Sequence, residues 1–265
     1  MDAKKYDIEA KIEQNIGLRP DIFLMSVFCP EIVKEAQPGQ FCMVKSSLIE
    51  GFDPLLRRPL SIHSIEKDLG LVEFLYRVVG KGTRALSMQA KGQQVHVFGP
   101  LGTGFKVRKH EIPIMVGGGL GVAPLLFLAQ ELADRKGVLI LGAVTKTQLL
   151  RLESFKETGL EILVATEDGS FGNRGLVTEV LDRLLASLDS DAKSDVAVLA
   201  CGPMPMLRAV YHLCEEHNVR CQVSLETVMA CGSGLCLGCA IRAKSGYVHV
   251  CKDGPCFDAQ GLLWD

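Results

Sequence analysis

The sequence predicts an α/β plus all-β protein with three parts: an N-terminal β-barrel, a doubly wound parallel sheet, and a small cysteine-rich segment. Three observations predict this fold class. Short β-prone runs separated by turn residues fill residues 1–102, strands alternate with helices over residues 103–225, and five of the ten cysteines crowd into residues 226–265. These three ranges are the predicted domains.

The barrel is predicted from β-prone runs with turn residues between them. Pro38-Gly39 and Lys91-Gly92 are such turns, and glycine and proline interrupt strands at these points. Many short strands at this spacing favour a small barrel. The runs cover residues 22–27, 40–44, 71–79 and 94–98.

The second part changes rhythm, because buried apolar strands now alternate with helical stretches. We expect strands at residues 112–116, 137–144, 160–166 and 196–200, and helices at 124–136 and 178–188. This alternation is typical of a doubly wound parallel sheet, in which ligands bind at the carboxyl ends of the strands.

Composition excludes several classes of function. The chain has 265 residues, of which 48% are hydrophobic, and a formal net charge of -2, which provides no footprint for nucleic acid or anionic membrane. It contains no run of about 20 apolar residues, as a membrane helix needs. Residues 1–7 are charged and lack the apolar core of a signal peptide. We therefore expect a cytoplasmic protein, in which a disulfide framework is not expected.

The cysteines near the C-terminus carry the most specific signal. Three of them follow the plant-type C-x4-C-x2-C spacing of a [2Fe–2S] cluster, with a fourth arriving from a returning segment. The glycines Gly232, Gly234 and Gly238 allow unusual backbone dihedrals, which bring amides near the cluster. A zinc site prefers paired C-x2-C knuckles, and one such pair is present here. The predicted cluster ligands are Cys231, Cys236, Cys239 and Cys251.

Two cysteines compete for the fourth ligand position. Cys251 follows the strand-like run 247–250 and precedes a turn, which suits a ligand. Cys256 lies beyond the Gly254-Pro255 turn and is expected to point elsewhere. A zinc staple and plain buried cysteines remain the alternative interpretations of the whole group.

A flavin site is indicated by the run from Arg57 to Ile62. Arginine pairs with a pyrophosphate, and a serine hydroxyl hydrogen-bonds a flavin nitrogen. Tyr76 is suited to stacking on an aromatic ring, and the turn 80–83 offers amides and a hydroxyl to phosphate. The alternative is a barrel strand with a surface arginine.

A nucleotide site is indicated by the glycine run between a predicted strand and a predicted helix. Gly117, Gly118, Gly119 and Gly121 allow a nucleotide to approach the backbone, although the run is not a G-x-G-x-x-G fingerprint and also suits a simple tight turn. A second loop, Cys201-Gly202-Pro203, follows a later strand at the same edge. Lys146 can meet a 2′-phosphate or lie free in solvent, so the choice between NAD and NADP stays open.

The order of these motifs resembles the ferredoxin–NADP reductase superfamily over residues 1 to about 225. With the tail, nearly the whole chain resembles the electron-transfer subunits of NAD-dependent dihydroorotate dehydrogenase. That resemblance implies the cofactors FAD, NAD and [2Fe–2S], and the same four cysteine ligands, with Cys256 at a non-ligand position. The flavin residues that it implies are Arg58, Pro59, Leu60, Ser61, Leu75, Tyr76, Arg77, Gly82 and Thr83.

The resemblance also implies a function. An FMN-containing catalytic subunit oxidises dihydroorotate in pyrimidine biosynthesis, and electrons flow through the cluster and FAD to NAD, in a heterotetramer. Hydride transfer needs no acid or base, so no catalytic residue is nominated, and His63 is interpreted as a residue on the surface of a strand. Two alternatives remain. One is a flavin subunit serving ferredoxin, sulfide or hydrogenase partners, whose first ligand tends to be aspartate, unlike Cys231. The other is a zinc-stapled nucleotide-binding regulator.

Overall fold

The computed structural model describes residues 4–49 and 51–264. Residues 1–3, on which part of the signal-peptide expectation rests, lie outside this range. The chain divides into two compact units. The barrel unit contains residues 1–104, 226–241 and 247–255, and the nucleotide unit contains residues 105–225, 242–246 and 256–265. The predicted boundaries at 102 and 225 lie at or near these divisions, whereas residues 226–265 are shared between the two units.

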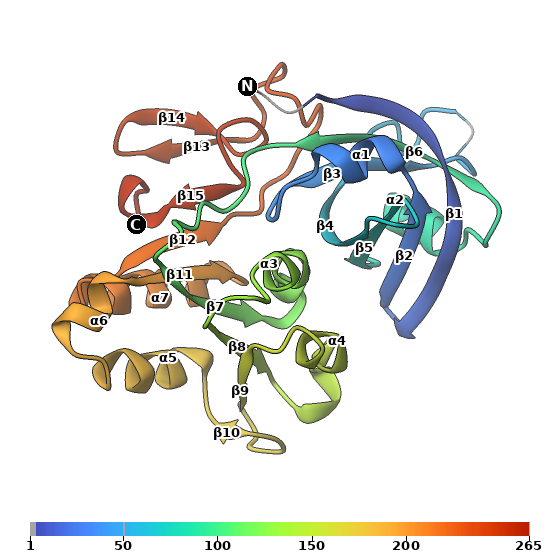
Figure 1. Ribbon diagram of the computed structural model, residues 1–265. Helices are drawn as coiled ribbons and strands as arrows, with labels where there is room; N and C mark the ends of the chain where they lie inside the picture. The colour runs from blue at the N-terminus through green and yellow to red at the C-terminus, as the bar shows by residue number, and fades with distance from the viewer. Residues whose placement is uncertain (1–3, 50, 265) are drawn as a thin grey trace. The chain divides into compact units, whose positions relative to one another are not determined.

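The barrel unit contains a closed antiparallel barrel of six strands in the order β1-β2-β5-β4-β3-β6 (Figure 1). The short helices α1 (Pro30–Glu35) and α2 (Lys81–Ser87) lie between strands. The strands are β1 (Tyr6–Arg19), β2 (Ile22–Phe28), β3 (Phe41–Ser46), β4 (Arg58–Glu66), β5 (Leu71–Arg77) and β6 (Gln94–Leu101).

Strand β1 closes the barrel, because it pairs with β2 on one side and with β6 on the other. In its first half, Ile8, Ala10 and Ile12 turn inward between charged residues that face outward. The sequence analysis did not predict this strand. Its low apolar content hides an alternation that is nevertheless sufficient for a strand buried on one face.

The nucleotide unit contains a seven-stranded sheet in the order β10-β9-β8-β7-β11-β12-β15. All neighbouring strands are parallel except β15, which runs antiparallel to β12. The order reverses between β7 and β11, and this switch point is where ligands of such sheets bind. The strands are β7 (Ile112–Gly118), β8 (Val138–Ala143), β9 (Glu161–Thr166), β10 (Asn173–Arg174), β11 (Val196–Cys201), β12 (Arg220–Ser224) and β15 (Cys256–Asp258).

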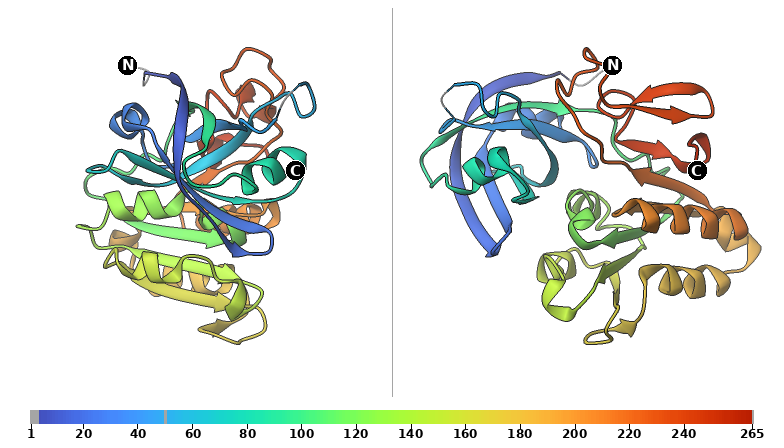
Figure 2. Two further views of the ribbon diagram at one scale, coloured as in Figure 1. Left: turned by 90° about the vertical axis from the view of Figure 1, so that its right-hand side faces the viewer. Right: turned by 180° about the vertical axis from the view of Figure 1, so that it is seen from behind.

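Helices cover both faces of this sheet, as a doubly wound fold requires (Figure 2). Helix α3 (Leu125–Glu131) contacts α4 (Leu152–Lys156), and α5 (Val177–Ala186) contacts α7 (Met204–Glu216). The strand and α5 predictions are confirmed to within two residues. The helix expected over 124–136 ends earlier, at Glu131, because the polar and glycine-containing run that follows forms turns.

The remaining elements are short. They are α6 (Ser190–Ser194), β13 (Ala240–Ala243), β14 (Gly246–His249) and the 3-10 turns η1 (Gly119–Val122), η2 (Lys146–Gln148) and η3 (Ala259–Gly261). Strands β13 and β14 form a two-stranded sheet. Within the described residues, no helix has the length and apolar character needed to cross a bilayer.

Candidate functional site

Residues 226–239 form an irregular loop that carries three of the predicted cluster ligands. We call the segment 226–241, which also includes the first two residues of β13, the cluster loop. The backbone has positive φ at Gly232 (70°), Gly234 (83°) and Leu237 (59°). A Cβ on Gly232 would lie 2.4 Å from Met43 Cγ, so glycine lets the loop pack on the barrel. The expectation for Gly238 was wrong, since its neighbour Leu237 takes the left-handed conformation instead.

The four predicted ligands are brought together by this loop and the segment that returns after β14. Cys239 Sγ lies 3.2 Å from Cys251 Sγ. The backbone N–H groups of Ser233 and Cys236 each donate to Cys231 Sγ at 3.4 Å. The cluster loop therefore directs its amides at sulfur as well as gathering thiols.

The other sulfur atoms receive similar donors. Gly234 N–H donates to Cys251 Sγ at 3.1 Å, and the Cys251 N–H donates to Cys239 Sγ at 3.4 Å. Such bonds stabilise sulfur in its thiolate form, which is the form that ligates iron.

The thiol pKa values differ across the group. Burial opposes ionisation of Cys231, but the donors from Ser233 and Cys236 outweigh it and lower the pKa of this thiol to about 6. Burial and the adjacent Cys239 thiol raise the pKa of Cys251 to about 12. One thiol is thus already suited to ligation, whereas Cys251 needs cationic iron to drive its deprotonation.

Four neighbouring cysteines with amide donors on three of their sulfur atoms fit a [2Fe–2S] cluster. Among the described residues, no three His, Cys, Asp or Glu side chains are placed to hold a single metal ion. The fit therefore rests on the sulfur contacts and amide donors described above.

Cys256 has different surroundings. It opens β15, where it pairs with Ser224 of β12 in the nucleotide unit, and it is buried. Burial and the neighbouring Cys201 thiol raise its pKa well above the usual value, against a hydrogen bond with Ser224 that lowers it. Cys256 is therefore placed as a strand thiol of the sheet, while Cys251 lies among the other three cysteines.

The predicted flavin residues lie along β4, β5 and α2 of the barrel. Strands β4 and β5 are antiparallel neighbours, and Arg58 begins β4. A Cβ on Gly82 would lie 2.4 Å from Arg58 Nε, so the guanidinium lies directly on this glycine. The structure thus brings Arg58, from the run 57–62, next to Gly82, from the turn 80–83, although the two are separated in sequence.

The groups around Arg58 are well fixed. Its Nη1 donates to the carbonyl oxygens of Leu56 and Arg57 at 3.0 and 3.1 Å. The Thr83 hydroxyl accepts the N–H groups of Val79 and Gly80 at 2.9 and 3.2 Å, which holds the turn before α2. An oriented guanidinium beside a glycine backbone fits a pyrophosphate group such as that of FAD.

Tyr76 is placed differently from the aromatic platform expected for it. Its side chain is buried, its ring stacks on Phe23 with centroids 5.8 Å apart, and its hydroxyl donates to Asn15 Oδ1 at 3.1 Å. Burial raises the pKa of this hydroxyl, although the hydrogen bond with Asn15 opposes the shift. The tyrosine ring therefore supports the barrel core from inside, next to Leu75, which is also buried.

The predicted nucleotide residues meet at the carboxyl ends of β7 and β11. A Cβ on Gly121 would lie 2.3 Å from the Cys201 carbonyl oxygen and 2.5 Å from Gly202 Cα. Gly117 pairs with Cys201 across the two strands. The two loops that the sequence placed at one edge are therefore in contact there; residues 117–121 and 201–203 are called the nucleotide edge below.

Met206 is a neighbour of this edge that the sequence analysis missed. Its Sδ atom lies 2.6 Å from where a Cβ on Gly118 would be, and its Cε atom 2.5 Å from that on Gly202. The side chain thus packs into the space left by two glycines on different loops. Its position three residues after Pro203, on the first turn of α7, was the available signal.

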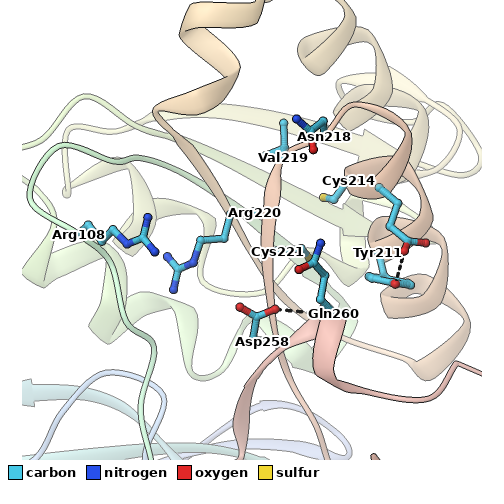
Figure 3. A pocket seen from close by; sticks show the side chains of 10 residues that line it. Arg108, Tyr211, Cys214, Asn218, Val219, Arg220, Cys221, Asp258 and Gln260 are labelled. Carbon is cyan, nitrogen blue, oxygen red and sulfur yellow. Dashed lines mark hydrogen bonds between the residues drawn. The ribbon is translucent and has the colours of Figure 1, made fainter. Parts of the chain in front are cut away.

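A cavity of about 440 Å³ lies in the nucleotide unit, beside the first residues of β12 (Figure 3). Arg108 and Arg220 point toward one another there. Arg220 Nη1 already bonds both oxygens of buried Glu111 at 2.9 Å and the Lys106 carbonyl at 3.0 Å. Its charge is therefore engaged, and the predicted cofactor residues lie elsewhere.

Comparison with known proteins decides which family this arrangement represents. Residues 226–263 match the model of the iron–sulfur cluster-binding domain of dihydroorotate dehydrogenase B, and residues 115–212 match the oxidoreductase NAD-binding domain. A Desulforamulus reducens protein named the electron transfer subunit of dihydroorotate dehydrogenase B (NAD(+)) is 38% identical over 97% of this chain and 98% of its own.

The chain belongs to the family of dihydroorotate dehydrogenase B electron-transfer subunits. A relative of the same name from Fusobacterium nucleatum is 37% identical over 96% of this chain and 97% of its own. Membership confirms the resemblance inferred from the motifs. It makes the chain an NAD-linked oxidoreductase subunit whose cofactors are FAD, NAD and an iron–sulfur cluster.

Solved structures confirm the fold. A chain from the NADH-dependent reduced ferredoxin–NADP oxidoreductase structure has a TM-score of 0.85 and 30% identity, covering 100% of this chain and 92% of its own. The ferredoxin reductase of carbazole 1,9a-dioxygenase matches at a TM-score of 0.65 and 22% identity, covering 83% of this chain and 68% of its own, and so supports the fold alone. The ferredoxin-reductase-like class predicted from sequence is confirmed.

Proposed function

We propose that this chain carries electrons between an FMN-containing subunit that oxidises dihydroorotate and NAD, in the cytoplasm, as part of a heterotetramer. The observation that carries the proposal is the convergence of Cys231, Cys236, Cys239 and Cys251 in a chain whose other unit is a nucleotide-binding sheet. The family to which the chain belongs supports the dihydroorotate partner and the pyrimidine pathway.

When bound, the cluster transfers single electrons and FAD exchanges single electrons as well as pairs, which links a one-electron carrier to NAD. The chain's own residues position these groups. Cys231, Cys236, Cys239 and Cys251 would hold the iron. Amides of the cluster loop donate to the Cys231 and Cys251 sulfurs, and the Cys251 amide donates to the Cys239 sulfur. Arg58 and Gly82 receive the flavin pyrophosphate. We assign no acid or base, since no proton needs to be moved by a side chain in hydride transfer.

The roles at the nucleotide edge follow from its glycines. The close contact of Gly121 with Cys201 and Gly202 brings the two loops together at one edge of the sheet, where a single nucleotide can reach both. NAD is proposed over NADP on the name of the family, which specifies NAD(+). Lys146 on η2 lies with its Nζ 5.1 Å from the Phe171 ring centroid, in a cation–π contact. Comparing NADH with NADPH as reductant tests this choice.

The proposed partner-facing surface includes the cluster loop itself. Val228, Leu235 and Leu237 are 86%, 84% and 57% exposed, and apolar side chains gathered on one loop are typical of a protein interface. Covering them with a partner subunit removes this apolar surface from water near the electron exit.

The test uses the purified complex and its Cys236→Ala variant. We expect the variant to lose the visible and EPR signals of the cluster and the dihydroorotate-dependent reduction of NAD. NADH reduction of an artificial acceptor through FAD should persist. If that activity disappears in protein still carrying FAD, the proposed order of carriers is wrong. Co-purification with a ferredoxin or hydrogenase partner in place of an FMN subunit would support the alternative flavin-subunit function.

A further inference from the structure

A shallow pocket of about 310 Å³ in the barrel unit contains the first cluster ligand and an ion pair. Cys231 lines it together with Arg57, Asp7 and Phe98. Arg57 lies one residue before Arg58, on the segment that enters β4. It belongs to the run that indicates a flavin site, but it is not among the residues assigned to FAD. Arg57 and Cys231 thus border the same pocket.

Three contacts fix the Arg57 guanidinium. Its Nη2 donates to both oxygens of Asp7, at 2.8 and 2.9 Å. Its Cζ lies 5.6 Å from the centroid of the Phe98 ring, a cation–π contact. With 27% of the side chain exposed, Arg57 is less accessible than Asp7, whose side chain is 58% exposed. Water therefore screens Asp7 more strongly than Arg57.

We propose that the Arg57–Asp7 pair sets the reduction potential of the cluster held by Cys231. The positive charge of Arg57 raises the potential, and the negative charge of Asp7 opposes that increase. The inference rests on the proposed function in requiring that the cluster be present. Reduction adds one electron to the cluster, and a nearby cation stabilises the added negative charge. The paired carboxylate cancels much of that effect, so the pair sets an intermediate potential.

The sign of the change separates this role from a structural one. Asp7→Asn leaves Arg57 without its counterweight, so the cluster potential should rise. Arg57→Gln leaves Asp7 alone, so the potential should fall. The double variant should return close to the wild-type value, since both charges are gone. A purely structural disturbance gives no reason for opposite shifts that cancel.

The experiment is an EPR-monitored redox titration of the holo-complex, with iron and FAD contents measured for each variant. Glu13→Gln is the matched control, because it removes a carboxylate paired with Lys11 on the same strand, outside the pocket. Arg57→Lys keeps the charge and should shift the potential less than Arg57→Gln. The shifts should shrink as salt is raised.

The outcomes are distinguishable. Opposite shifts for the two single variants, with recovery in the double variant and no change in Glu13→Gln, support the inference. Unchanged potentials, or shifts of one sign in both variants, overturn it while leaving the proposed electron path intact. Absence of any cluster signal in the wild-type complex overturns both the inference and the proposed function.

Discussion

In the proposed function, the cluster loop and the nucleotide edge bind their cofactors with different parts of the chain. In the cluster loop, side chains provide the chemistry, and backbone amides point at the sulfur atoms of Cys231, Cys239 and Cys251. At the nucleotide edge, a close backbone contact requires a residue without a side chain, since a Cβ on Gly121 would overlap the Cys201 carbonyl. The cluster loop thus depends on its sulfur atoms and amide donors, whereas the nucleotide edge depends on the lack of a Cβ atom at Gly121. Substitutions should therefore damage them in different ways.

The largest expected effect separates two nearby cysteines. Cys251→Ser should abolish the cluster absorbance, because the Cys251 sulfur lies 3.2 Å from that of Cys239 and within the ligand group. Cys256→Ser should retain it, because Cys256 belongs to a strand of the sheet. Iron and sulfide analysis of both purified variants measures this. Equal cluster loss in the two variants, with both proteins folded, would mean that the ligand assignment is wrong.

The second prediction concerns the nucleotide edge. Gly121→Ala should destabilise the fold by about 1–3 kcal/mol, because the added methyl group overlaps backbone atoms that cannot move independently. The KM for NADH should rise about tenfold for each 1.4 kcal/mol of binding that is lost. Thermal unfolding and steady-state kinetics measure the two effects.

Gly261→Ala is the matched control for this change. No heavy atom of the described residues lies within 4 Å of a Cβ placed on Gly261, which belongs to the same unit. It should leave both Tm and KM near their wild-type values. A wild-type KM in Gly121→Ala would refute the close contact at this edge.

The third prediction asks whether the barrel behaves like the nucleotide edge. Gly82→Ala should weaken FAD retention by about tenfold, a loss of about 1.4 kcal/mol, because the new Cβ displaces Arg58. Stability should change less than in Gly121→Ala, since a side chain moves more easily than backbone. Gly80→Ala is the control, because its φ of -169° suits any residue and no described heavy atom lies within 4 Å. Flavin fluorescence on dilution reports FAD release, and equal release from both variants would contradict the prediction.

The smallest effect is a labelling rate in metal-free protein. The lowered Cys231 pKa of about 6 means that this thiol is mainly thiolate at pH 7, so alkylation should be fast there and slow below pH 6. Burial and Cys201 raise the pKa of Cys256, which should resist alkylation throughout this range. Mass spectrometry of iodoacetamide-treated protein measures both sites. A Cys231 rate that keeps rising steeply through pH 8 and above would contradict the lowered pKa.

The two regions also differ in what the sequence could predict. Cysteine ligands reveal themselves by spacing, because one short loop must deliver three thiols, and the family comparison supports the resulting iron–sulfur domain. The glycine run was predicted as a nucleotide turn, yet its contact with Cys201 depends on strand order in a folded sheet. The packing of Met206 depends on the same order, and no local pattern encodes it.

Long-range packing also explains what the sequence could not predict in the barrel. Arg58 lies on Gly82 only once β4 and α2 are side by side. Tyr76 was expected to face a ligand. The local sequence of a strand does not show which face of the sheet an aromatic side chain lies on, and here the Tyr76 ring packs on Phe23. The polar β1 strand was missed for a related reason, since it pairs with the distant strand β6, from Tyr6 with Gly99 to Lys11 with Gln94.

The division of the chain into interleaved units has a consequence for biosynthesis. The barrel unit begins with the first residues but also includes residues 226–241 and 247–255, with the nucleotide unit's longest segment between them. A ribosome releases residues 105–225 before the cluster loop exists, so the six parallel strands of the sheet can pair while the thiols are still being made. Cys251 emerges last of the four. Delivery of iron to all four thiols therefore follows the synthesis of residues 105–225.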